Sequence, residues 1–123
     1  MASYKEKMRA ALIGKVKAAG LCDDRGAAFV ASSTGGFVLL AVNGNTLTIS
    51  EIDMQHNIGR CLNQIPLKEI SALTVKEGFL SVLFGGTPLS FQWNGKKFAF
   101  SNVVITGGVK ESVEIIRKES AAS

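Results

Sequence analysis

The segment LSFQWNGKKFAF, residues 89–100, has alternating apolar residues on both sides of Asn94-Gly95. An Asn-Gly pair in this setting is the strongest short-range signal of a β-hairpin with a two-residue turn. Folding at this turn places the apolar residues of the two strands on one face, because side chains alternate along a strand. The predicted pairs are Leu89 with Phe100 and Phe91 with Phe98. The segment therefore predicts a hairpin with one face directed toward a core.

Three further turns with glycine lie between apolar runs, at Asn43-Gly44, Glu77-Gly78 and Gly85-Gly86. Each two-residue turn fixes the register of its hairpin, and the hairpins at Glu77-Gly78, Gly85-Gly86 and Asn94-Gly95 share strands in succession. The predicted pairs are Leu40 with Leu47 and Val38 with Ile49, then Val75 with Leu80 and Leu73 with Val82, then Val82 with Leu89 and Leu80 with Phe91. Their mutual agreement predicts an antiparallel meander.

Seven or eight short strands are expected in one domain that spans residues 1–123. They are predicted near residues 27–32, 37–42, 46–53, 60–67, 70–76, 79–84, 89–93 and 97–101. So many short strands in a small domain should form a bent meander that curls into a small barrel or a pair of packed sheets rather than one flat sheet. The fold class is therefore mainly β, a β-rich α+β domain whose meander covers residues 27–101.

A helix is predicted at each end of the meander. Within residues 2–20, apolar residues that include Leu12 and Val16 recur every fourth position, and Gly20 supplies a left-handed stop. Within residues 108–119, apolar residues recur at the spacing of an amphipathic helix that caps the open end of the meander.

From about Phe29 to Arg117 the chain resembles a bacterial pleckstrin-homology-like (PH-like) domain. The segment 65–70, Ile-Pro-Leu-Lys-Glu-Ile, is similar to the family's segment in which a proline ends one strand and an isoleucine enters the core at the start of the next. Leu47-Thr48-Ile49 and the helix around Val113 fit the same pattern. The resemblance implies a strongly bent meander that is closed by a C-terminal helix.

Members of this family that bind phosphoinositides hold the headgroup with basic residues around the first hairpin loop. The corresponding loop here, residues 32–36, is Ser-Ser-Thr-Gly-Gly and has no cation. Lipid headgroup binding is therefore not carried over to any residue. Arg60, Lys68, Lys76, Lys96 and Lys97 could form another anion site, but solvated charges that discourage edge-to-edge aggregation are the favoured interpretation.

The positive charge of the chain is concentrated in its first 20 residues. They contain five basic residues and one acidic residue, a net charge of +4, which equals the net charge of the whole chain. The candidate anion-binding residues are Lys5, Lys7, Arg9, Lys15 and Lys17. A basic helix with an apolar stripe can lie on an anionic membrane. Its stripe is thin and has no Trp or Phe anchor, so packing on the domain or on another subunit is favoured.

Catalysis and metal binding have little support in the sequence. His56, Asp53 and Cys61 could form a cluster, but their spacing matches no catalytic or zinc motif, so no catalytic residue, metal or cofactor is expected. Cys22 and Cys61 lack a CxxC spacing and are expected to be free reduced thiols in a cytoplasmic protein. Trp93 shares a face with core residues, so nucleic-acid stacking is not expected.

These observations favour a non-catalytic binding or assembly domain that acts by protein interaction or self-association. Such a domain can add a strand at an open sheet edge, or hold a peptide between an edge and the C-terminal helix, using backbone hydrogen bonds. The alternative is peripheral binding to an anionic membrane through the basic helix. The sequence names neither the partner nor the oligomeric state.

Overall fold

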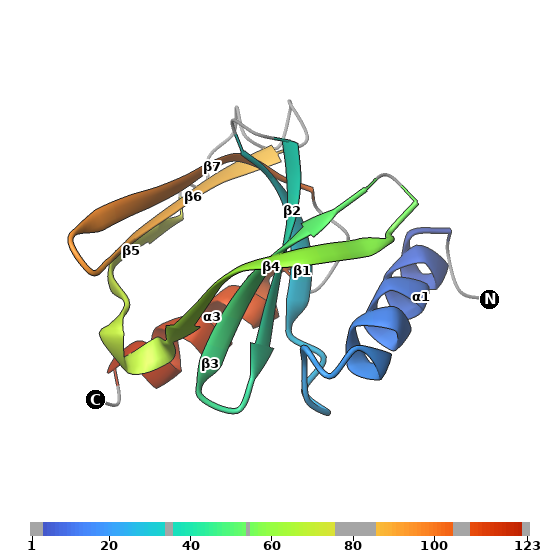
Figure 1. The fold of residues 1–123 in the computed structure, drawn as a ribbon, viewed down its shortest axis with the longest axis horizontal. Helices are drawn as coiled ribbons and strands as arrows, with labels where there is room; N and C mark the ends of the chain where they lie inside the picture. The colour runs from blue at the N-terminus through green and yellow to red at the C-terminus, as the bar shows by residue number, and fades with distance from the viewer. Residues whose placement is uncertain (1–3, 34–35, 54, 76–85, 105–108, 122–123) are drawn as a thin grey trace.

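The computed structural model describes residues 4–33, 36–53, 55–75, 86–104 and 109–121. Along the chain, the described elements are helix α1, seven strands and helix α3, with a short 3-10 helix, η1, between the fourth and fifth strands (Figure 1). The elements are α1 (Tyr4–Ala18), β1 (Ala28–Ser33), β2 (Gly36–Asn43), β3 (Thr46–Ile52), β4 (Ile58–Pro66), η1 (Leu67–Glu69), β5 (Ser71–Val75), β6 (Gly86–Trp93), β7 (Lys96–Val104) and α3 (Val109–Ala121). The expected mainly β fold with a helix at each end is confirmed.

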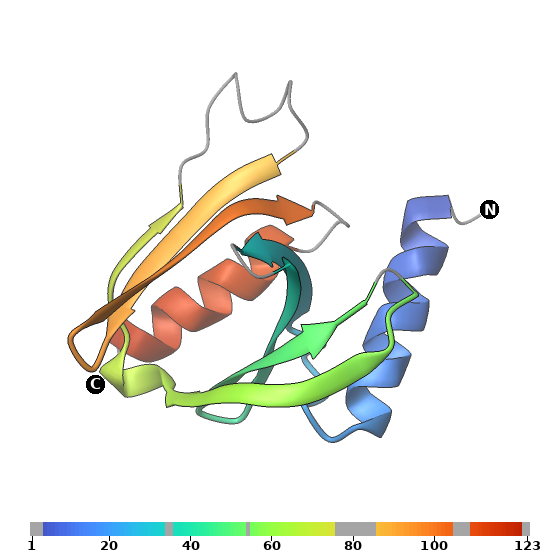
Figure 2. The ribbon, with the colours of Figure 1, turned by 45° about the horizontal axis from the view of Figure 1, so that its top comes forward.

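The strands are antiparallel and follow the order β4-β3-β2-β1-β7-β6-β5. The four-stranded part and the three-stranded part form two layers that meet at β1 and β7, through the pairs Ala31 with Val103 and Ser32 with Asn102. The layers diverge from this junction (Figure 2). Within the described residues β4 and β5 do not pair with each other, so the sheet is bent and open there and no closed barrel is seen.

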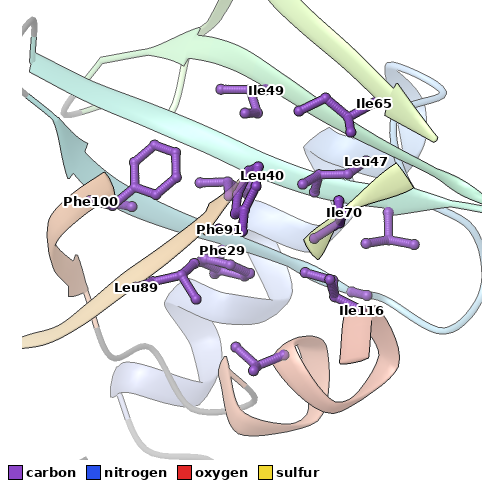
Figure 3. Packing of buried hydrophobic residues seen from close by; sticks show 14 of the residues in the cluster. Phe29, Leu40, Leu47, Ile49, Ile65, Ile70, Leu89, Phe91, Phe100 and Ile116 are labelled. Atoms are coloured by element: carbon purple, nitrogen blue, oxygen red, sulfur yellow. The ribbon is translucent and has the colours of Figure 1, made fainter. Parts of the chain in front are cut away.

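The main core lies between the two layers and α3, and we call it the inner cluster. It takes Phe29, Leu40 and Leu47 from the four-stranded layer and Leu89, Phe91 and Phe100 from the other (Figure 3). Val113 and Ile116 of α3 complete it. Because both layers and α3 bury side chains against one another, the strands and this helix form one folding unit.

A second, smaller cluster lies on the opposite face of the four-stranded layer, and we call it the outer cluster. Leu12 and Val16 of α1 pack there against strand residues. The strand and loop members are Cys22, Ala28, Val30, Leu39, Ala41 and Ile52. Leu39 and Leu40 point to opposite faces and both are fully buried, which explains the uninterrupted apolar run of β2.

The hairpin between β6 and β7 has the predicted register. Leu89 pairs with Phe100 and Phe91 with Phe98. The Phe91 and Phe98 rings stack with centroids 5.2 Å apart. Asn94 and Gly95 both have positive φ, at 54° and 78°, as a type I′ turn requires.

The predicted register of the β2–β3 hairpin is wrong by two residues. Leu40 pairs with Ile49 rather than Leu47, and Asn43 pairs with Thr46, so the turn residues are Gly44-Asn45. Gly44 has φ of 59°, the position at which a type II′ turn favours glycine. A shift of two residues leaves each side chain on its predicted face, so the apolar pattern could not distinguish the two registers.

The predicted meander paired Leu89 with Val82, a residue of the strand predicted at 79–84. Leu89 pairs with Val75 on one side and Phe100 on the other, so its predicted pairing across Gly85-Gly86 is wrong. The turn at Glu77-Gly78 and the predicted strand 79–84 lie outside the described residues.

Helix α1 ends in a Schellman motif, as Gly20 predicted. Gly20 has φ of 73°, its N–H donates to Lys17 O at 2.9 Å, and the Leu21 N–H donates to Val16 O at 3.1 Å. These two bonds satisfy carbonyls that the helix end would otherwise leave unpaired. In the part of the chain described here, no helix is long and apolar enough to cross a membrane.

Candidate functional site

The candidate basic residues all lie on α1. The side chains of Lys7, Lys15 and Lys17 are exposed. Lys15 Nζ donates a hydrogen bond to the carbonyl oxygen of Gln55, 3.1 Å away in the loop between β3 and β4. The side chains of Lys5 and Arg9 lie outside the described residues. Lys7 and Lys17 are thus the described cations available to an external anion, whereas Lys15 also ties α1 to the sheet.

The apolar stripe of α1 faces the sheet. Leu12 and Val16 are fully buried in the outer cluster, and Ile13 packs against it while half-buried. Of the two packing surfaces favoured by the sequence, the domain and another subunit, the structure shows the stripe on the domain. Burial of two such side chains contributes about 3–6 kcal/mol at most. These two side chains are therefore not available for insertion into a bilayer while α1 is docked.

The loop after β3 is organised by Asp53 rather than by His56. Asp53 Oδ1 accepts hydrogen bonds from the N–H groups of Gln55 and Asn57 at 2.9 and 2.8 Å, and Oδ2 accepts one from Asn57 Nδ2. The bonds from Asn57 hold the pKa of Asp53 below its usual value. His56 is half-buried with φ of 64°.

No metal-binding cluster is seen around the described part of this loop. In the described ranges, no group of three or more His, Cys, Asp or Glu side chains is placed to hold a metal ion. Cys61 is exposed on β4, where its thiol contacts Asn63 O at 3.7 Å, while Cys22 is buried in the outer cluster. Neither cysteine forms a disulfide, as predicted.

The other weighed cations come from several different elements. Arg60 on β4 pairs with Glu51 at 3.5 Å, Lys68 is in η1, and Lys96 and Lys97 follow the β6–β7 turn. Lys76 lies outside the described residues. The described strand pairings bring none of these cations next to another except Lys96 and Lys97, which are adjacent in the chain.

Trp93 belongs to the core side of β6, as predicted. Its ring is half-buried against the inner cluster and lies 6.2 Å from the Phe98 ring. Its indole N–H donates to Glu69 Oε1 at 2.9 Å, which links β6 to η1. A tryptophan held on one side by the core and at its polar end by a carboxylate has a structural role.

Among the described strands, β4 and β5 are the two edges of the sheet, and both are irregular. Along β4 the register with β3 shifts twice, around Leu62 and between Ile58 and Cys61, and each shift adds a residue to β4. The strand ends at Pro66, which has no N–H. Along β5, the two residues between Ser71 and Thr74 oppose one residue of β6, Phe91.

The β5 bulge contains a non-glycine residue with positive φ. Ala72 has φ of 53°, and its carbonyl accepts a hydrogen bond from the Thr74 hydroxyl at 3.2 Å. Ser71, Ala72 and Thr74 are exposed. Bulges protect edge strands from indiscriminate pairing, so any partner strand must match a short stretch of regular backbone.

A clamp that the sequence analysis missed holds the α1–β1 loop on the β2–β3 turn. Arg25 makes paired contacts with the Asp23 carboxylate, the shortest at 2.8 Å, and its guanidinium also donates to Gly44 O at 2.8 Å. The Gly44 N–H donates to Asp23 Oδ2 at 2.9 Å. Arg25 also lies 3.5 Å from Glu119 near the end of α3. The hydrogen bonds from the Arg25 side chain and from the Gly44 N–H hold the pKa of Asp23 far below its usual value.

The scan against protein-family models and the searches of curated proteins and of solved structures found no match to this chain.

The described geometry offers three surfaces for contact: the exposed cations of α1, the two bulged strand edges, and the exposed apolar side chains Phe37 and Leu62, which are 40% and 41% exposed. Each can support non-covalent binding.

Proposed function

We propose that this chain is a non-catalytic PH-like domain that binds a protein partner or assembles with itself. The observation that carries the proposal is the open sheet, whose four- and three-stranded layers end, among the described strands, at β4 and β5 and hold a C-terminal helix against their common core. This arrangement fits the bent meander that the family resemblance implies. The function rests on backbone groups at an edge, which need no distinctive side chains.

The β5 edge is the better acceptor of an added strand. β4 carries two bulges and ends in Pro66, whereas β5 carries one bulge and has no proline. The pairs Thr74 with Ser90 and Val75 with Leu89 are consecutive, so the second half of β5 has regular backbone. A partner segment in extended conformation would pair with this half of β5.

The test compares equivalent charge insertions at the two edges. Full-length protein, Thr74→Lys and the matched control Gln64→Lys on β4 are used as bait in cell lysate, and each is sized in solution. A partner or defined oligomer that is lost in Thr74→Lys and kept in Gln64→Lys supports binding at β5, because a charge on an edge strand opposes pairing. A monomer that retains no partner in any form contradicts the proposal.

A second candidate function, attachment to an anionic membrane, is favoured by the exposed Lys7 and Lys17 of α1. Each cation near such a surface contributes about 1 kcal/mol, and salt weakens the attraction. Co-sedimentation with anionic vesicles should be salt-sensitive and weakened by the double substitution Lys7→Glu and Lys17→Glu. The control makes the same charge change at Lys96 and Lys97. Equal losses in both variants would indicate a response to net charge rather than a binding face on α1.

A further inference from the structure

The outer face of β1, β2 and β3 forms an apolar bed for a helix. Small side chains, Ala28 and Ala41, lie in the same outer cluster as the larger Val30, Leu39 and Ile52. Alanines let a helix backbone approach the sheet, and the larger residues contact the helix side chains. In this chain the bed is occupied by α1, which inserts Leu12 and Val16, two branched residues four positions apart on one helical face.

Helix α1 is separate from the core that unites the two layers. The inner cluster draws on β1 to β7, on η1 and on α3, and none of the described residues of α1 belongs to it. The contacts of α1 are with the outer cluster and, through Lys15, with the loop at Gln55. The inner core would therefore remain buried if α1 left the sheet, so α1 can open without global unfolding.

The connection between α1 and β1 contains a defined hinge. Asp23 and Arg25 are clamped to Gly44, so the loop is fixed to the body of the domain from residue 23 onward. Between the end of α1 and this clamp, Cys22 is buried in the outer cluster and Leu21 packs against it, so the hinge is Ala19 and Gly20. Gly20 within this hinge has φ of 73°, and a side-chain hydrogen bond from Asn43 Nδ2 to Gly20 O at 3.0 Å ties it to the sheet. Rotation at these few residues would reorient the whole helix.

We propose that α1 is a displaceable lid and that the bed beneath it receives α1 of a second copy of this chain. The occupant follows from the contacts of α1, because a helix that fits the bed in its own chain makes the same contacts in an identical chain. Reciprocal exchange gives a closed dimer with two equivalent interfaces and replaces each intrachain contact by its interchain counterpart. This surface is distinct from β4 and β5, so the inference goes beyond strand addition and stands if neither edge binds a partner.

The experiment mixes two copies of the full chain, one unlabelled and one labelled with ¹⁵N, at high protein concentration. After incubation and dilution, native mass spectrometry measures the dimer masses. The expected result is a dimer of mixed mass that forms at high concentration and dissociates slowly on dilution, because both helices must leave their beds. A chain that remains monomeric at every concentration overturns the proposal.

Two substitutions on α1 distinguish exchange from other modes of association. Leu12→Asp places a charge in the bed and should abolish the mixed dimer. Gly14→Gln is the matched control on the exposed face, where an added Cβ meets nothing within 4 Å, and should leave dimer formation unchanged. Loss of the dimer in Gly14→Gln would instead indicate pairing through the exposed face of α1. A dimer lost in Thr74→Lys but kept in Leu12→Asp would indicate pairing at the β5 edge, and either result overturns the exchange.

Hydrogen exchange on the unmodified monomer tests the lid without relying on a variant that must fold. The amides of α1 should exchange about 100-fold faster than those of β2, because local opening of α1 requires less free energy than unfolding of the inner core. Equal exchange rates for α1 and β2 would show that α1 opens only with global unfolding, which overturns the proposal.

Discussion

Ala72 is one of three non-glycine residues with positive φ in the described part of the chain, with His56 and Asn94. A left-handed conformation costs a non-glycine residue about 1–2 kcal/mol, because its Cβ approaches the following carbonyl. Ala72 adopts φ of 53° within the β5 bulge and is exposed. The bulge interrupts regular pairing along β5, an edge of the described sheet. The strained residue therefore lies in the feature that protects this edge from indiscriminate strand pairing.

Ala72→Gly should raise the free energy of unfolding by about 0.5–1 kcal/mol, since glycine adopts positive φ without a steric penalty but loses more entropy on folding. The measurement is the midpoint of urea denaturation. Ala99→Gly is the control, because Ala99 is exposed on β7 and paired with Ser90 in regular strand geometry. It should lower stability by about 0.5–1 kcal/mol. A decrease in stability for Ala72→Gly would contradict this interpretation of the bulge.

Asp23 should make stability depend on pH, because its pKa is lowered in the folded protein by Arg25 and Gly44. The folded protein binds this proton less readily than the unfolded chain does. The stabilisation is therefore complete above the unfolded pKa of about 4 and is lost as the pH falls toward the lower folded pKa.

Asp23→Asn should cost about 1–2 kcal/mol at pH 7, after allowance for the partial exposure of the pair. It should also reduce the loss of stability between about pH 5 and pH 2. Thermal melts over this range compare the variant with Asp24→Asn, a change at an exposed neighbour. Parallel pH profiles for Asp23→Asn and the unmodified protein would contradict a role for the Asp23 carboxylate.

At the scale of elements, the two Asn-Gly turns show what local sequence can specify. The turn at Asn94-Gly95 has the predicted register because its two residues supply both positive φ angles. The β2–β3 turn instead centres on Gly44-Asn45, where Asp23 and Arg25 bind the N–H and C=O of Gly44. Because these contacts come from a loop about 20 residues away in the chain, local turn chemistry could not predict them.

The candidate basic site was partly predictable for a similar reason. The spacing of Leu12 and Val16 predicts a helix with one apolar face and places lysines away from it. Which surface that face covers depends on the outer side of β1–β3. From the sequence alone, the apolar residues of that side fit a position in the core and a position at a sheet edge equally well. The hydrogen bond from Lys15 to Gln55 O joins residues 40 positions apart, and periodicity carries no information about such a contact.

Two glycines of the α1 region should respond in opposite directions to alanine. Gly20→Ala should lower the free energy of unfolding by about 1 kcal/mol, because the Schellman motif requires φ of 73° there. Gly14 lies inside α1 with open space around an added Cβ, so Gly14→Ala should raise it by about 0.5–1 kcal/mol. Circular dichroism and urea denaturation measure both. The same sign for both variants would contradict the described end of α1.

For the whole molecule, the apolar pattern specified which residues are buried better than it specified how the layers meet. The layers join through two residue pairs of β1 and β7, strands that are far apart in the chain. Local turns set register within hairpins but say nothing about this pairing or about the divergence that leaves β4 and β5 free. The open form is thus a consequence of long-range geometry.

The shared inner cluster predicts that both layers unfold together. Ile116 of α3 is buried in this cluster with residues of both layers, so Ile116→Ala should lower the free energy of unfolding by about 2–4 kcal/mol. Trp93, the single tryptophan, reports on the three-stranded layer, while far-ultraviolet circular dichroism reports on the whole fold. The two midpoints should coincide and shift equally in the variant. Ile115→Ala, at a half-buried position of the same helix, is the control and should cost less. If the Trp93 midpoint shifts without a matching change in circular dichroism, the layers unfold separately and the inner cluster does not couple them.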